Sequence, residues 1–241
     1  MILHSVTKTL GRGRRKQRVL DRLDWSIDPK ARIVVLGQKR SGKSTLLDTL
    51  AGSSIPTSGW VERRAMVSPR LPLTRFAQRF TTPRHLAIQH AHLYLADPDA
   101  LCRFVEVFTG IESAMDVPFR HLPNAARSSL QLALFYGIPF DFYLFDNRVM
   151  PGIGPIQQNV REAFELRSQT AGMILATSSV KAARNFGGSG AVLHRGQLVP
   201  YATVEEAIQV HEYLLFHDPL QTANYWEDDV MDADSVDDMS L

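Results

Sequence analysis

The chain has 241 residues, of which 44% are hydrophobic, and its formal net charge is +2. That length allows a sizeable core and lies near the upper end for one domain, so we expect one domain with a subdomain. No segment approaches the roughly 18 consecutive apolar residues of a membrane-spanning helix, and residues 1–18 lack an apolar core of signal-peptide type. The single cysteine, Cys102, excludes an internal disulfide and fits a reducing compartment. We expect a soluble chain with no direct membrane span, whose membrane role, if any, comes through a partner.

The first third of the chain has the pattern of a hairpin followed by a strand and a helix. Residues 2–7 and 19–27 alternate apolar and polar positions around a turn rich in Gly and Arg. Residues 32–36 form a β-branched run that ends at Gly37, and a helical pattern follows over residues 43–51. This order predicts an antiparallel hairpin, a buried strand, a loop and a helix.

Helical spacing dominates the middle of the chain, and we expect a helical subdomain at about residues 76–136. Strands and helices alternate after it. The expected strands are 142–145, 173–177, 190–194 and 197–201, and the expected helices are about 155–168 and 203–215. The alternation predicts an α/β fold with a parallel sheet and right-handed crossovers.

The two ends of the chain carry opposite charge. Residues 1–18 contain six Lys or Arg and no acid, whereas residues 225–241 contain seven acids and no base. The basic end could meet nucleic acid, anionic lipid or nucleotide phosphates, but an Arg-rich hairpin tip is more often a solvated loop, and we expect no nucleic-acid partner. Residues 218–241 have too little apolar surface to offset the entropy of ordering, so we expect an acidic, disordered tail.

A phosphate-binding loop is expected between the strand at 32–36 and the helix that follows. Residues 37–44 match G-x-x-x-x-G-K-[ST] at every fixed position, in the strand–loop–helix context that the motif requires. Its N–H groups and the helix N-terminus favour anions, Lys43 is expected to reach the outer phosphates, and Ser44 is expected to ligate Mg²⁺. The alternative is a glycine turn that happens to precede Lys-Ser. The predicted nucleotide-binding residues are Gly37, Gln38, Lys39, Arg40, Ser41, Gly42, Lys43, Ser44 and Thr45.

A matching acid is expected at the end of a second buried strand. Asp146 follows four large apolar residues at 142–145. Its carboxylate could bind Mg²⁺ through water. The alternative role is that of a strand-ending Asp that caps the next loop.

The order of hairpin, phosphate loop, helical insertion, strand-ending Asp and closing β-turn resembles the ATP-binding domain of ABC transporters, to about residue 217. Residues 19–24, 56–59 and 137–146 look like their counterparts in exporters of capsular polysaccharide and polysialic acid. Within them, the Phe140-Asp141-Phe142-Tyr143 run is the more family-specific piece. The resemblance implies a P-loop ABC-type fold with an antiparallel β subdomain and a helical subdomain.

The resemblance also implies ligands, partners and a location. ATP and Mg²⁺ would be the cofactors, and the domain would work as a homodimer or heterodimer. A separate membrane permease subunit would contact the helical insertion and move a lipid-linked polysaccharide. The chain would lie on the cytoplasmic face of the inner membrane.

Several positions depart from the family pattern. Where the family has a Leu-Ser-Gly-Gly signature, this chain has Leu122-Pro123-Asn124-Ala125, which lacks the hydroxyl and the glycines that approach ATP on a partner subunit. Asn147 stands at the position of the general base, and it can orient a water but cannot accept its proton. Loss of such a base typically costs about 10²- to 10⁴-fold in rate. Ser178 replaces the switch histidine.

Three further assignments follow from the alignment with the family. Gln78 is the candidate for the glutamine that joins the ATP site to the helical insertion and would touch the metal. Arg18 replaces the aromatic residue that stacks on adenine, and its guanidinium plane could stack in the same way, or it could be a solvated charge at a strand end. Residues 150–153, Met-Pro-Gly-Ile, replace the loop that would carry an Asp across the dimer.

Two functions remain open at this point. One is a transport ATPase of the polysaccharide-export type whose hydrolysis is slow but retained, because positioning and phosphate electrostatics persist. The other is a nucleotide-binding subunit that regulates or dimerises an export complex without useful turnover. A P-loop kinase or GTPase is disfavoured, because the sequence has no Asn-Lys-x-Asp segment and no Arg-rich acceptor lid.

Overall fold

The structure is a computed structural model that describes residues 1–11, 16–71, 81–147 and 156–218. The strands are β1 (Ile2–Leu10), β2 (Gln17–Ser26), β3 (Arg32–Leu36), β4 (Ser58–Glu62), β5 (Val67–Leu71), β6 (Phe142–Asp146), β7 (Gly172–Thr177), β8 (Ser189–His194) and β9 (Gln197–Tyr201). The α-helices are α1 (Lys43–Ala51), α2 (Pro83–Leu93), α3 (Pro98–Thr109), α4 (Asn124–Gly137), α5 (Gln157–Thr170), α6 (Val180–Phe186) and α7 (Val204–His217). Among these described residues, no helix is long and apolar enough to cross a bilayer.

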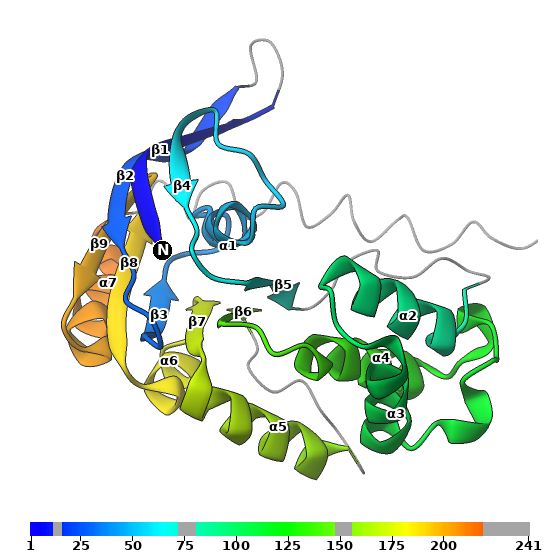
Figure 1. The fold of residues 1–241 in the computed structure, drawn as a ribbon. Coiled ribbons are helices and arrows are strands. Elements are labelled where there is room, and N and C mark those ends of the chain that lie inside the picture. The colour runs from blue at the N-terminus through cyan, green and yellow to red at the C-terminus, as the bar shows by residue number, and fades with distance from the viewer. Residues whose placement is uncertain (12–15, 72–80, 148–155, 219–241) are drawn as a thin grey trace, which may run out of the picture.

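The strands form two sheets. The smaller sheet is antiparallel, with the order β2-β1-β4, and the larger one has the order β5-β6-β7-β3-β8-β9. In the larger sheet all neighbours are parallel except β8 and β9, which form the closing antiparallel pair. The expected α/β class with a parallel sheet and an antiparallel subdomain is confirmed (Figure 1).

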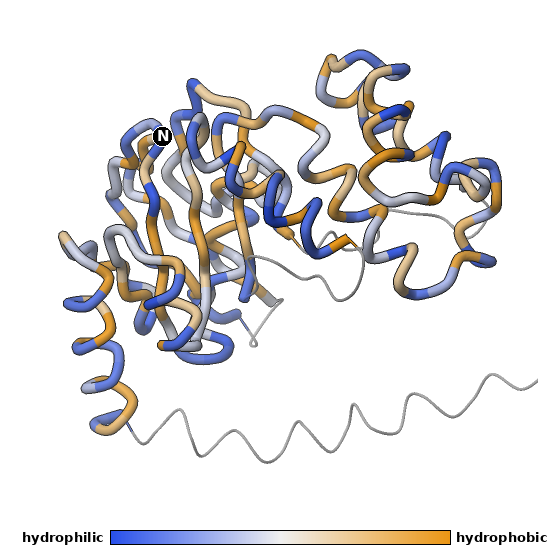
Figure 2. Tube along the Cα trace, turned by 90° about the horizontal axis from the view of Figure 1, so that it is seen from below, coloured by the Kyte–Doolittle hydropathy of each residue, from blue (hydrophilic) through white to orange (hydrophobic). Residues whose placement is uncertain are grey.

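The larger sheet is buried on both faces, as its apolar strands predict. Alternate residues of β3 point to opposite sides: Val34 and Leu36 belong to the core cluster that includes α6 and α7, both of which contact β3, whereas Ile33 and Val35 belong to the cluster that includes α1 and the antiparallel sheet. Figure 2 shows α7, the helix that leads into the grey trace, alternating between hydrophilic and hydrophobic turns. This helix packs its buried face against β8.

The helical subdomain consists of α2, α3 and α4, which pack on one another and stand to one side of the larger sheet (Figure 1). Asp97 and Thr82 cap the first turns of α3 and α2 with their side-chain oxygens, and a proline follows each cap at the first helical position. Both arrangements are common at helix starts.

Three short elements, β4, β5 and α6, are present although the pattern did not predict them. Strand β5 contains Pro69, which argues against a central strand because proline cannot donate to the ladder. The structure resolves this conflict by placing β5 at the edge of the larger sheet, where it pairs only with β6. Its parallel register sets Arg70 opposite Leu144 and Leu71 opposite Phe145, close to the strand end that carries Asp146.

Candidate nucleotide-binding site

The loop between β3 and α1 folds tightly around Gly37 and Gly42. A Cβ atom on Gly37 would lie 2.5 Å from Ser41 Oγ and 2.7 Å from the carbonyl oxygen of Leu193, so no larger residue fits there. Gly42 has φ +100°, a left-handed conformation that favours glycine. No side chain caps the start of α1, which leaves its first N–H groups directed at the loop.

Lys43 lies inside this loop. Its ammonium donates hydrogen bonds to the carbonyls of Gly37 at 2.8 Å and Gln38 at 2.6 Å, and its side chain is buried. Burial lowers the pKa of Lys43 to about 8, although the charge of Asp146 acts in the opposite direction. The loop therefore holds a desolvated positive charge at its centre.

Ser44 and Asp146 meet although they are far apart in the sequence. Ser44 Oγ donates to Asp146 Oδ2 over 2.6 Å, and the Asp146 side chain is buried. Helix α1 packs against β6, which brings the first turn of the helix to the end of that strand. A hydroxyl and a carboxylate side by side are the oxygen donors that Mg²⁺ prefers.

Asn147 follows Asp146 with φ 65°. Its backbone N–H donates to the Ala176 carbonyl at 2.7 Å, and its side-chain amide donates to Asp146 Oδ1 at 3.3 Å. Asn tolerates a left-handed backbone better than most residues, so the local conformation suits the residue found here. The side-chain amide of Asn147 is therefore directed at the Asp146 carboxylate.

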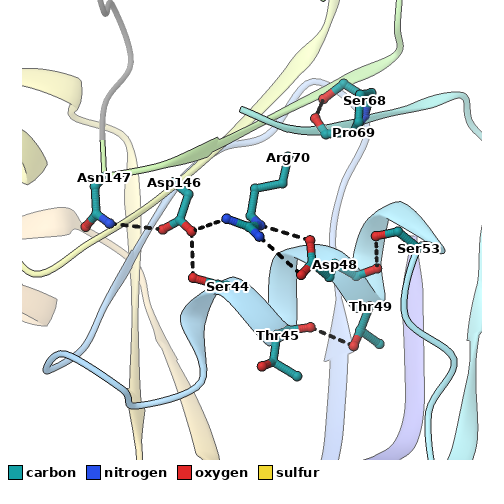
Figure 3. A network of polar contacts seen from close by, with 10 residues as sticks. All are labelled: Ser44, Thr45, Asp48, Thr49, Ser53, Ser68, Pro69, Arg70, Asp146 and Asn147. Atoms are coloured by element: carbon teal, nitrogen blue, oxygen red, sulfur yellow. Dashed lines mark hydrogen bonds and ion pairs between the residues drawn. The ribbon is translucent and has the colours of Figure 1, made fainter. Parts of the chain in front are cut away.

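Arg70 contacts Asp146, and the sequence did not reveal this contact. Figure 3 shows its guanidinium between two carboxylates: Nη1 donates to Asp146 Oδ2 at 2.7 Å, and Nε donates to Asp48 Oδ1 at 2.9 Å. Burial lowers the pKa of Arg70, but the two carboxylates more than offset it and raise the pKa overall. Asp146 Oδ2 thus accepts hydrogen bonds from both Ser44 and Arg70.

His211 of α7 is a second residue that the sequence did not reveal. It is buried, and its Nε2 has no hydrogen-bond partner among the described residues. Burial lowers the pKa of His211, followed by the charge of Lys43, whereas a hydrogen bond to the backbone of Ser178 raises it. The lowered pKa favours the neutral imidazole, which is hydrogen-bonded to the backbone of Ser178.

A cavity of about 390 Å³ opens over the loop. The residues that line it are Leu10, Gln17, Val19, Lys39, Arg40, Gly42, Lys43, Ser44, Thr45, Asp146, Asn147 and Ser178. The fold therefore gathers the predicted loop, Asp146, Asn147 and Ser178 around one space.

Other predicted residues lie elsewhere. Arg18 does not line this cavity, and its exposed guanidinium is 3.0 Å from Asp21 Oδ1, so its adenine-stacking role stays a prediction. Gln78 and residues 150–153 fall outside the described residues. Pro123 precedes the first turn of α4 and offers no side-chain cap there, as its missing hydroxyl requires.

The residues present fit a nucleotide polyphosphate. The glycine positions keep the loop tight, the helix start is uncapped, and Ser41 Oγ is buried with no partner among the described residues. Lys43 supplies the positive charge. The Ser44–Asp146 pair fits Mg²⁺ by donor type, with Arg70 as an additional cation on the same carboxylate oxygen.

Comparison with solved structures establishes the fold. The ATP-binding subunit of an ABC transporter superposes with a TM-score of 0.70 at 15% identity, covering 88% of this chain and 98% of that one. The chain has the fold of an ABC-type ATP-binding domain. The dimeric ATP-binding cassette MJ0796 bound to ADP and Pi superposes on this chain with a TM-score of 0.65 at 16% identity, over 84% of this chain and 98% of that one.

Sequence comparison confirms the resemblance to capsule exporters. The chain is 27% identical over 194 residues to the ATP-binding protein BexA of Haemophilus influenzae, covering 80% of this chain and 89% of BexA. It is 24% identical over 197 residues to the capsule polysaccharide export ATP-binding protein CtrD of Neisseria meningitidis, over 81% and 91% of the two chains. It is 23% identical over 219 residues to a polysialic acid transport ATP-binding protein KpsT of Escherichia coli, over 90% and 97%. No family model matches the chain.

Proposed function

We propose that this chain is the ATP-binding subunit of an ABC-type exporter of a capsular or other cell-surface polysaccharide. It binds ATP with Mg²⁺ and hydrolyses it slowly. The observation that carries the proposal is the loop closed around Lys43 beside the Ser44–Asp146 contact of 2.6 Å. The similarity to BexA, CtrD and KpsT over most of the chain supports the choice of cargo.

The chain's own residues divide the work of binding. The loop N–H groups and Lys43 hold the phosphates by charge and geometry. Ser44 and Asp146 would hold Mg²⁺, which neutralises phosphate charge when bound. Thr45 lies in the same cavity and is assigned to an inner phosphate. These contacts provide positioning and electrostatic stabilisation, which supply most of the catalysis in phosphoryl transfer.

The residues that would activate the attacking water are the weaker part of the site. Asn147 lines the cavity, and its amide can orient a water but cannot take its proton. Ser178 is short and stays neutral at all ordinary pH values. Pro123 removes a hydroxyl from the segment assigned to the partner's ATP. Since base and signature are both altered in one chain, slow turnover is expected in a homodimer and in a heterodimer.

The proposed assembly places two ATP-binding domains against a membrane permease subunit on the cytoplasmic face of the inner membrane. The absence of a spanning helix in the described residues is compatible with attachment through that partner. MJ0796, which shares the fold, is dimeric.

A second function, a nucleotide-binding subunit that regulates or dimerises the export complex without turnover, is favoured by one specific observation. Asn147 has φ 65°, and glutamate is less suited to that conformation than asparagine. The backbone at the base position is therefore adapted to a residue that cannot act as a base.

Single-turnover ATP hydrolysis distinguishes the two functions. The purified chain is measured alone and with its permease partner, beside Lys43→Ala. Hydrolysis above the rate of Lys43→Ala supports the slow ATPase, and a rate equal to that variant in both settings leaves the regulatory subunit. If the chain binds no nucleotide in the presence of Mg²⁺, both functions are wrong.

The base position is tested by Asn147→Glu. Asn147→Gln is the control, because glutamine has the size of glutamate but carries no charge. We expect only the glutamate to raise turnover, by about 10²-fold or more. Equal rates in the two variants would show that more than the missing base limits hydrolysis.

A further inference from the structure

Arg70 forms ion pairs with one carboxylate on each of two elements that border the phosphate loop. It comes from the edge strand β5, and its guanidinium connects α1 to the end of β6. Asp48 lies four residues after Ser44, which puts both on the same face of α1. The register of β5 against β6 then sets Arg70 beside Asp146.

The guanidinium is held from two sides. Its Nε and Nη2 donate to the two oxygens of Asp48, at 2.9 and 3.4 Å, and Nη1 donates to Asp146 Oδ2 at 2.7 Å. The Asp146 side chain is 6% exposed and the Arg70 side chain 20%, so water screens their interaction only in part. These three bonds use three of the five guanidinium N–H groups.

The carboxylate oxygen that Arg70 contacts is the one that Ser44 contacts. Ser44 and Asp146 are the candidate Mg²⁺ residues, so the guanidinium reaches the candidate metal site through Asp146, while Arg70 itself lines a different cavity from the one over the loop. Like charges repel, so a guanidinium on Asp146 Oδ2 opposes a divalent cation there. Asp48 offsets part of the guanidinium charge, and the part that remains attracts the phosphates.

We propose that Arg70 is a resident cation of the phosphate site, which holds Asp146 in place and takes over part of the charge that Mg²⁺ contributes to nucleotide binding. The inference rests on the proposed nucleotide-binding function and deepens it. It assigns Arg70 as a positioning residue that makes binding of a nucleoside triphosphate only weakly dependent on the divalent cation.

The test is equilibrium binding of a fluorescent ATP analogue to the full chain, in millimolar Mg²⁺ and in excess EDTA. For the wild type we expect the two dissociation constants to differ by less than about tenfold. In Arg70→Gln we expect binding in EDTA to weaken about tenfold or more and binding in Mg²⁺ to change less than about threefold. Arg70→Lys keeps a charge and is expected to lie between the two.

Arg63→Gln is the matched control. Arg63 also donates to α1, but at the carbonyls of its last turn, away from the phosphate loop. The Arg63→Gln variant removes the same charge as Arg70→Gln. We expect its ratio of dissociation constants, in EDTA over in Mg²⁺, to stay at the wild-type value. Thermal unfolding without nucleotide reports whether each variant is folded.

Three results would overturn the role of Arg70. A wild-type affinity that falls more than about a hundredfold in EDTA would do so without any variant. An equal loss in Mg²⁺ and EDTA in Arg70→Gln would make the residue a structural bridge. If the ratio of the dissociation constants in EDTA and Mg²⁺ changed as much in Arg63→Gln as in Arg70→Gln, the effect would not be specific to Arg70. Failure of the wild type to bind nucleotide in either condition would instead refute the nucleotide-binding function itself.

Discussion

Raising the pH from 7 to 9 is expected to weaken ATP binding, because the pKa of Lys43 lies at about 8 before nucleotide is bound. The ammonium is desolvated among the carbonyls of Gly37 and Gln38, and only its charged form attracts phosphate. About nine-tenths of Lys43 is charged at pH 7 and about one-tenth at pH 9, which follows from a pKa near 8. The dissociation constant should therefore rise about tenfold, equivalent to about 1.4 kcal/mol.

The same pKa shift determines whether protons are taken up or released when ATP binds. Bound phosphates raise the pKa of Lys43, so binding at pH 9 takes up about 0.9 proton, whereas binding at pH 7 takes up about 0.1. Calorimetric titrations in two buffers of different ionisation enthalpy measure this uptake. The phosphate itself does not interfere with the measurement at pH 9, because its last proton is lost near pH 6.

Lys43→Arg serves as the control, since a guanidinium keeps its charge over this range. Its binding, although weaker, is expected not to vary with pH. If the wild type binds equally well at pH 7 and 9 with no proton uptake, the ammonium is not desolvated as the contacts indicate. If Lys43→Arg shows the same slope as the wild type, another group titrates.

The remaining predictions concern stability, and urea unfolding measures each of them. Gly59→Ala should lower the free energy of unfolding by about 2 kcal/mol or more, since φ is +75° and the new Cβ would lie 2.4 Å from two backbone oxygens of β1. Gly110→Ala is the control: φ is +66° but the space around it is open, so the loss should be only about 1 kcal/mol. Similar losses from both would exclude the clash. Arg63→Ala should lower the free energy of unfolding by about 1.5–3 kcal/mol, because Arg63 donates to carbonyls in the last turn of α1. Arg64→Ala is the control and should change little, because the side chain of Arg64 is 89% exposed. Burial lowers the pKa of His90 to about 4, so the unfolded chain binds a proton at this residue more readily than the native state does. The free energy of unfolding should therefore fall by up to about 3 kcal/mol as the pH drops from about 6.5 to 4. His90→Gln should lose correspondingly less over that range, and an unchanged pH dependence would contradict this cause.

The parallel core could be predicted because its residues repeat one simple pattern. Val34, Val35, Leu144 and Leu175 belong to short apolar runs that are buried on both faces, and such runs stand out from the surrounding polar sequence. The phosphate loop was equally visible, since its spacing is contiguous. Local signals of this kind need no knowledge of the tertiary structure.

Arg70 and His211 could not be predicted, because their roles depend on contacts between distant segments. Arg70 reaches Asp146 across 76 residues, through the register of β5 on β6, and Pro69 next to it conceals the strand. His211 lies in an ordinary amphipathic helix, where a buried histidine is no signal by itself. Only the packing of α7 brings it to the backbone of Ser178.

The strand order of the larger sheet has a consequence for solubility at high concentration. Its two edges are β5 and β9, and each contains a proline, Pro69 and Pro200. Each proline removes one N–H from an edge that would otherwise offer a template for a further strand, a protection found in many β proteins. Copies of this domain are thus discouraged from joining edge to edge into a continuous sheet.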